Sequence, residues 1–292
     1  MRGTTAPAGL PLPKLLLVAL LSVTWDAAAE TTKPGPDEPG SEEENQNLPA
    51  EEPRASRWDF KLGAGGAFGP NYEGSEDLQP SGRPQPLAEV RWRTGNAWDT
   101  KLFAGTLGGV GVEIADMDRF SIGLKGAYGG GRSEDADGRL EGLGDINDSV
   151  NATLFGKLKF EHFAFAMEVT HYFAGSDGTL VSFGPGTKLS LTERLELGFG
   201  LSTTLGDGAY MGEFFSVTQG QAQRSVDNLD EFDADAGFKD VSLRLQASYR
   251  ILESWELSAR ARVGLLLGDA ADSPVVEQAI QPDLGVGLIY RF

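Results

Sequence analysis

The sequence predicts an all-β protein, a closed antiparallel transmembrane β-barrel of about twelve strands, with ten as the alternative count. Apolar and polar residues alternate along many segments after position 57, which is typical of strands that face an apolar phase on one side and water on the other. Most of the connections between these segments alternate between short and long. The chain also ends on an aromatic residue, Phe292, and barrels carry aromatic girdles at the membrane interfaces.

The first 57 residues lie outside the predicted barrel. Residues 1–29 combine a positively charged start with a short apolar run, and Ala27 and Ala29 supply small residues for cleavage. This pattern predicts a cleaved secretory signal peptide, because the run is too short to span a membrane. Residues 30–57 are rich in proline and glutamate, so we expect a disordered acidic periplasmic tail that is either a spacer or a docking segment.

Each alternating segment between residues 58 and 292 is predicted as one strand. The segments lie at about 58–69, 85–93, 97–105, 108–115, 120–129, 150–160, 163–173, 179–191, 195–202, 241–250, 255–265 and 281–292. In chain order, the clearest apolar faces carry Trp58, Phe60 and Leu62; Ala88, Val90 and Trp92; Phe120, Ile122 and Leu124; Val150, Ala152 and Leu154; Phe163, Phe165 and Met167; Leu195, Leu197 and Phe199; Val241, Leu243 and Leu245; Trp255, Leu257 and Ala259; and Leu284, Val286 and Leu288. The segment at 108–115 alternates least clearly, which leaves ten strands as the alternative.

The connections predict the orientation of the barrel. Short turns fall at 95–96, 116–119, 161–162, 192–194 and 252–254, and long connections at 70–83, 132–147, 205–236 and 269–280. Outer-membrane barrels have short periplasmic turns and longer outer loops. Twelve strands therefore place both ends of the barrel in the periplasm, with the last strand closing the barrel on the first. The expected location is the outer membrane of a Gram-negative cell.

A soluble β-sandwich or lipocalin-like barrel is the alternative fold. A soluble sheet of this length needs a second packed layer, and the sequence shows no helical period that would supply it. The C-terminal residues Gly287, Tyr290 and Phe292 also resemble the assembly signal of bacterial outer-membrane barrels.

Charged side chains recur on the polar faces of the predicted strands. The candidate lumen charges are Arg91, Arg93, Arg244, Arg260, Arg262, Glu89 and Glu256. Two interpretations stay open, because these groups either line a charged lumen or pair into a ladder of ion pairs that plugs it.

Catalytic and binding chemistry is sparse in the sequence. Cysteine is absent, and a net charge of −18 argues against nucleic-acid binding. The two histidines, His162 and His171, lack a convincing partner, although a pairing of His171 with Ser182 across strands stays open. The acidic segment at 230–235 fails the pattern of a calcium-binding EF-hand loop. We therefore predict no catalytic, cofactor or metal residues, and expect at most weak, non-specific Mg²⁺ or Ca²⁺ binding by the acidic outer loops.

Several ordered segments resemble the MipA/OmpV family. They are the glycine-rich stretch Gly63 to Asp77 with Pro70-Asn-Tyr-Glu-Gly-Ser75, Gly142 to Ile146, Phe215 to Gln221, Leu266 to Val276, and the terminal Tyr290-Arg-Phe292. The resemblance covers the chain from Trp58 to Phe292, and leaves out the acidic tail.

The resemblance implies an outer-membrane barrel without enzymatic activity. Its name-giving member is a scaffold, the MltA-interacting protein, which brings a lytic transglycosylase together with a murein synthase. A small pore, a surface adhesin or an envelope-stress protein is the alternative function that the family leaves open. The family offers no catalytic residues to transfer to this chain.

Overall fold

The computed structural model describes residues 58–80, 85–93, 100–106, 109–116 and 119–292. The predicted signal peptide, with Ala27 and Ala29, and the predicted tail at 30–57 lie outside the described residues. The predicted hairpin turn at 95–96 also lies outside them.

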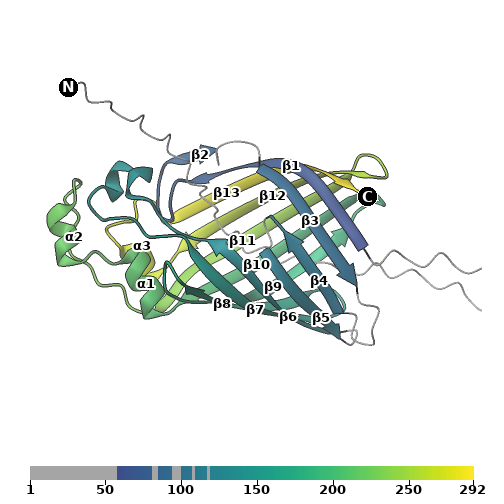
Figure 1. Cartoon of the computed structure of the whole chain (residues 1–292), viewed down its shortest axis with the longest axis horizontal. Coiled ribbons are helices and arrows are strands. Elements are labelled where there is room, and N and C mark those ends of the chain that lie inside the picture. Colours follow the sequence, from purple (N-terminus) through teal and green to yellow (C-terminus); the bar gives the residue numbers. More distant parts are fainter. Residues whose placement is uncertain (1–57, 81–84, 94–99, 107–108, 117–118) are drawn as a thin grey trace, which may run out of the picture.

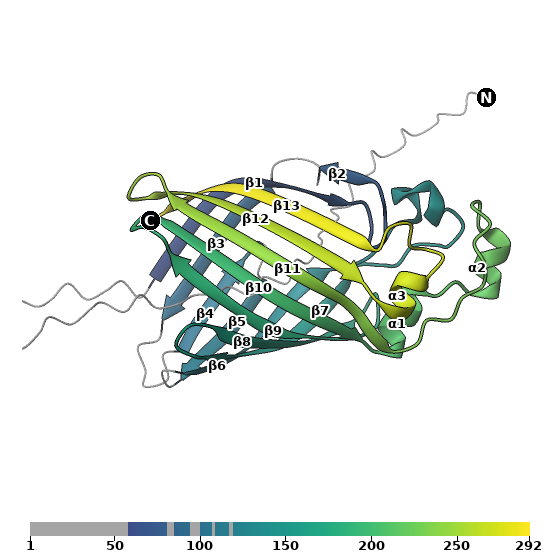
Figure 2. The same cartoon turned by 180° about the vertical axis from the view of Figure 1, so that it is seen from behind.

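The described chain forms a closed antiparallel β-barrel (Figures 1 and 2). Its strands are β1 (Trp58–Pro70), β2 (Leu78–Pro80), β3 (Gln85–Arg93), β4 (Thr100–Gly105), β5 (Gly109–Asp116), β6 (Phe120–Gly129), β7 (Ser149–Lys159), β8 (Ala164–Phe173), β9 (Gly178–Ser190), β10 (Leu195–Gly206), β11 (Gly237–Arg250), β12 (Trp255–Leu266) and β13 (Ile280–Arg291). Apart from the three-residue strand β2, which pairs only with β1, these are the twelve barrel strands. The predicted fold class and strand count are confirmed.

The last strand closes the barrel on the first, as predicted. β13 pairs with β1 from Lys61 opposite Arg291 to Phe68 opposite Leu284. The segment with the weakest alternation is a full member of the wall, since β5 pairs with β4 on one side and with β6 on the other. The alternative count of ten strands is therefore wrong.

The two faces of the wall differ in the way that a membrane barrel requires. Apolar side chains point outward and stay exposed, as shown by Leu284 at 52% and Val286 at 56%. Polar side chains on the inner face are buried, as shown by Asn151 at 4% and Thr153 at 2%. A soluble domain would bury its apolar face, whereas here hydrocarbon lipid covers it. The sandwich and lipocalin-like alternatives are therefore wrong.

One end of the barrel carries the long connections, which we call the cap, and the opposite end is the short-turn end (Figures 1 and 2). The cap contains η1 (Glu134–Ala136), η2 (Gly138–Leu140), α1 (Gly208–Phe215), α2 (Gln219–Arg224) and α3 (Gly268–Asp272). These helices were not predicted, because the longest has eight residues and covers about two turns of periodicity. No helix in the described ranges has the length and apolar character needed to cross a membrane.

Aromatic side chains gather near the C-terminus at the short-turn end. The rings of Trp255 and Tyr290 lie 5.1 Å apart, and those of Tyr290 and Phe292 lie 4.8 Å apart. The backbone N–H of Phe292 donates to the carbonyl of Phe60 on the first strand at 3.1 Å. The terminal residue therefore contacts both strands of the closing seam.

Candidate functional site

The cap forms from all four long connections, and a buried apolar cluster joins them. The cluster contains Tyr72, Leu140, Leu143, Val217, Leu229 and Val275. Tyr72 comes from the first long connection, the two cluster leucines Leu140 and Leu143 from the second, and Val275 from the last. Each fully buried side chain of this size contributes about 1.5–3 kcal/mol. The four connections are therefore one packed body and not independent loops.

A second apolar cluster attaches helix α1 to the inner wall of the barrel. Tyr210 stacks on Phe214 at 4.5 Å, and its ring lies 5.6 Å from that of Tyr172 on β8. Met211 and Phe215 on the same helix are almost completely buried. The cap therefore packs into the mouth of the barrel as well as over it.

Helix α1 starts where it does because of its N-cap. The carboxylate of Asp207 accepts a hydrogen bond from the backbone N–H of Tyr210 at 2.9 Å. Partial burial alone would raise the pKa of Asp207, but hydrogen bonds from Tyr210 and Thr179 outweigh it and lower that pKa. The charged carboxylate thus stabilises the first turn of the helix.

The motif Tyr72 to Ser75, which carries the family resemblance, connects the first long connection with the last. The Tyr72 hydroxyl donates to the carbonyl of Val275 at 3.0 Å, and burial together with Glu277 raises the pKa of Tyr72. The Gly74 N–H donates to the side-chain oxygen of Gln281 at 3.0 Å. The Gly74 carbonyl accepts from the backbone of Glu277 at 2.8 Å. These bonds hold the cap across the seam between β1 and β13.

Only glycine fits at position 74. Its φ is +108°, and a Cβ built there would lie 2.6 Å from Cγ2 of Val276. The glycine in the motif is therefore explained by backbone conformation and by close approach.

A buried arginine forms a hydrogen bond to the C-terminal end of α1. Arg132 is 7% exposed, and its Nη1 donates to the carbonyl of Phe214 at 2.8 Å. Burial lowers the pKa of Arg132 to about 10, although Tyr72 and Glu213 act in the opposite direction. Its cation lies near the C-terminal end of α1, where the helix dipole favours positive charge.

A β-bulge places two consecutive charges inside the barrel mouth. Thr204 pairs with Asp240 and Leu205 with Phe238, so Lys239 is the extra residue of β11. Both Lys239 and Asp240 are consequently buried, although strand alternation would send one of them outward.

These two charges belong to an ion-pair network that we call the latch, formed by Glu73, Lys239, Asp240 and Arg262. Lys239 Nζ contacts Asp240 Oδ2 at 2.8 Å and also pairs with Glu73 from the motif. Arg262 Nη2 lies 3.4 Å from Asp240 Oδ1. The Tyr210 hydroxyl donates to Glu73 at 3.5 Å, and burial, followed by the charge of Glu73, raises the pKa of Tyr210 well above its usual range. The latch therefore ties the cap to the wall.

The predicted lumen charges all lie on strand positions opposite to the exposed apolar side chains. Glu89 pairs with Arg91 at 2.5 Å, and Glu256 pairs with Arg291. Arg260 lies 4.0 Å from Asp283, and Arg262 belongs to the latch.

Two of the predicted lumen charges stand apart. Arg93 is exposed at the end of β3. The side chain of Arg244 makes no hydrogen bond or ion pair with the residues that the structure describes, and Arg244 lies directly opposite Arg262. Paired and unpaired charges therefore coexist on the inner wall, and both interpretations of the lumen stay predictions.

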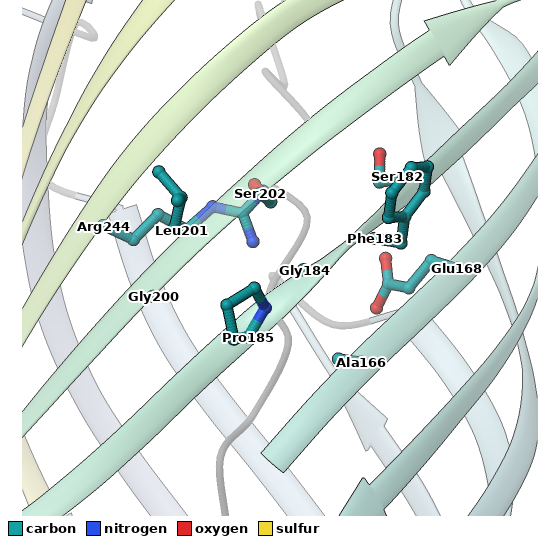
Figure 3. Close-up of a pocket in the computed structure, with 10 residues that line it drawn as sticks. All are labelled: Ala166, Glu168, Ser182, Phe183, Gly184, Pro185, Gly200, Leu201, Ser202 and Arg244. Carbon is teal, nitrogen blue, oxygen red and sulfur yellow. The ribbon is translucent and has the colours of Figure 1, made fainter. Parts of the chain in front are cut away.

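A small gap in the wall lies beside Arg244. Pro185 on β9 has no N–H, and β9 and β10 form no ladder pairs between Gly200 and Thr203. A cavity of about 20 Å³ lies there, with room for one water molecule. Figure 3 shows the Arg244 guanidinium and the Glu168 carboxylate extending toward this gap from opposite sides.

The sequence interpretation missed the carboxylate at this gap and three of the four latch charges, Glu73, Lys239 and Asp240. Glu168 is 5% exposed and pairs with Lys125 at 3.2 Å. Strand alternation places Glu168 on the inner face, so that signal was present in the sequence. Lys239 and Asp240 carried no such signal, because the bulge breaks the alternation.

The open pairing of His171 with Ser182 is wrong. His171 Nδ1 lies 3.2 Å from the Thr179 hydroxyl on the outer face, while Ser182 hydrogen-bonds Thr204 at 3.0 Å on the inner face. The wall therefore separates them. His162 is exposed in its turn beside Glu161. In the part of the chain that the structure describes, no group of three or more His, Asp or Glu side chains could hold a metal ion.

Comparisons with known proteins find one matching family and several similar solved structures. The model of a family described as MltA-interacting protein MipA matches residues 62–292. Among solved structures, the chain is similar to in-vitro folded OmpT, an outer membrane protein of Vibrio cholerae, with 8% identity, a TM-score of 0.36, and coverage of 83% of this chain and 100% of that one. It is similar to KdgM porin with 11% identity, a TM-score of 0.38 and coverage of 80% and 99%. It is also similar to the translocator domain of the autotransporter NalP from Neisseria meningitidis, with 11% identity, a TM-score of 0.41 and coverage of 82% and 90%.

These identities and TM-scores are low, so the individual structures carry no argument about function. Sequence comparison with curated proteins finds no match.

Proposed function

The chain belongs to the family of the MltA-interacting protein MipA, and from this membership we propose that it is an outer-membrane scaffold for peptidoglycan-remodelling enzymes. The proposed partners are a lytic transglycosylase and a murein synthase. The proposal includes export by a signal peptide cleaved after Ala29, and a barrel without catalytic activity.

The packed cap is the observation that carries this proposal. Its two apolar clusters and the latch occupy one end of the barrel, which supports a role in binding over a role in passage. The short-turn end is then the part that proteins in the periplasm reach. Exposed charges in its turns, such as Glu193 and Glu253, offer polar contacts to a partner.

A crosslinking pull-down from envelopes tests the scaffold, with a lytic transglycosylase as the detected protein. We expect capture by the native chain, and reduced capture by the variant Glu193→Lys with Glu253→Lys at the short-turn end. The matched control, Asp230→Lys with Glu231→Lys, reverses the same number of charges on the exposed cap and should leave capture unchanged. Absence of the enzyme from the native pull-down would refute the scaffold.

A second variant tests the tail. Deletion of residues 30–57 removes the acidic segment and leaves the described barrel intact. Undiminished capture by this variant would exclude a docking role for the tail, while the turns would remain the contact site.

A small pore is the second candidate, and the partly exposed charges on the inner face favour it. Conductance across planar bilayers separates the two candidates, because a silent native barrel is incompatible with a pore. A surface adhesin would instead act through the cap. Asp230→Lys with Glu231→Lys, and not Glu193→Lys with Glu253→Lys, would then lose binding to the surface that the adhesin contacts.

A further inference from the structure

Along β11, the inner wall of the barrel changes from packed near the cap to exposed further from it. On the inner face of β11, Asp240 and Ser242 are each 2% exposed, whereas Gln246, further from the cap on the same face, is exposed. Solvent therefore reaches the inner wall below the cap. The cap packs into one mouth, and we call the interior between the cap and the short-turn end the cup.

The lining of this cup carries the opposite charge to the chain as a whole. The full chain has a net charge of −18, yet lysine and arginine outnumber aspartate and glutamate on the described inner face of the barrel strands. A cleft lined with one sign of charge between low-dielectric walls concentrates ions of the other sign. The cup therefore attracts anions.

Three arginines, Arg244, Arg260 and Arg262, gather near the floor of the cup, and we call them the arginine triad. Arg244 lies directly opposite Arg262, and Arg260 lies two positions along the same face of β12. Like charges that face each other across a strand pair repel. The nearby carboxylates compensate them only in part, because Asp240 is shared with Lys239, Asp283 lies 4.0 Å from Arg260, and Glu168, which extends toward Arg244, pairs with Lys125.

The inner wall leaves room beside the guanidinium groups of the triad. Glycines 264 and 285 leave room for the guanidinium groups, since a Cβ at Gly264 would lie 3.3 Å from Nη2 of Arg262, and one at Gly285 would lie 2.7 Å from Nε of Arg260. The Nε atoms of Arg260 and Arg262 are buried without a hydrogen-bond partner among the described residues, whereas the side chains as a whole are 36% and 25% exposed. Guanidinium forks match the geometry of carboxylate and phosphate oxygens.

We propose that the arginine triad is a binding site for a small anionic solute bearing carboxylate or phosphate groups, which reaches it through the short-turn end. This site does not depend on the scaffold function, since the scaffold uses the turns and the solute uses the lumen. Because the cap closes the other mouth, the solute enters and leaves the site from the periplasm.

Titration of the purified full-length protein in detergent at low ionic strength tests the site, with citrate and inorganic phosphate as separate probes. The variant Arg244→Gln with Arg260→Gln should bind the better probe about tenfold or more weakly, since hydrogen bonds to charged groups carry such differences. The control Arg194→Gln with Arg224→Gln removes two exposed arginines outside the lumen and should bind like the native protein. The preferred probe identifies the chemistry as carboxylate or phosphate.

Arginine modification of the native protein provides a measurement that needs no variant. Phenylglyoxal with and without probe, followed by peptide mass spectrometry, should show protection at Arg244 and Arg260 and none at Arg194. Failure of the native protein to bind either probe, equal affinity in the triad and control variants, or absence of protection would each overturn the proposal.

Discussion

At the scale of single residues, the family motif is explained by packing and hydrogen bonding. Tyr72 contributes to the apolar cluster, Glu73 to the latch, and Gly74 to the backbone bonds that connect the first and last long connections. Each residue acts through a different kind of interaction, so substitutions at neighbouring positions should weaken the cap in different ways.

Gly74→Ala should loosen the cap without preventing barrel formation. The added methyl group meets Val276, and the positive φ costs about 1–3 kcal/mol for a residue with a Cβ. We expect faster proteolysis of the long connections in the folded protein, with the mobility shift between heated and unheated samples retained. Gly138→Ala is the control, because a Cβ there meets nothing within 4 Å. Equal protease resistance in the two variants would contradict this account.

At the scale of elements, alternation in the sequence predicted the wall well and the cap poorly. Every barrel strand was predicted, because each must present an apolar face to lipid over its whole length. β2 was missed because a three-residue strand has too few residues to show a period. The bulge at Lys239 was missed because its inward direction depends on pairing with Thr204 and Leu205. The latch likewise joins residues far apart in the sequence, from Glu73 to Arg262, and no local pattern connects them.

The closing strand also carries the proposed assembly signal Gly287, Tyr290 and Phe292. Phe292→Ser removes the ring that packs against Tyr290 and should lower the amount of assembled barrel in the outer membrane. Ile289→Ser, a comparable apolar-to-polar change on the opposite face of the same strand, should have a smaller effect. The heat-dependent mobility shift of the protein in envelope fractions measures assembly. Normal assembly of the Phe292 variant would remove the terminal residue from the signal.

At the scale of the whole molecule, the barrel combines a closed end with an open, cationic interior. The cap closes the end with the long connections through two apolar clusters and the latch. The inner wall below the cap is charged and reached by solvent. We therefore expect the cap, and not a ladder of ion pairs along the whole lumen, to block passage through the barrel.

Removal of part of the cap should consequently turn a silent barrel into an anion-selective one. The native protein in planar bilayers should show no steady conductance, because α1 packs into the mouth. Replacement of residues 208–224, which include α1 and α2, with a short glycine–serine linker should open a pathway past the arginine triad. Chloride should then carry more current than potassium, since the cationic lining attracts anions. Arg244→Gln with Arg260→Gln in the shortened chain should reduce this preference, and potassium selectivity in the shortened chain would contradict the cationic lining.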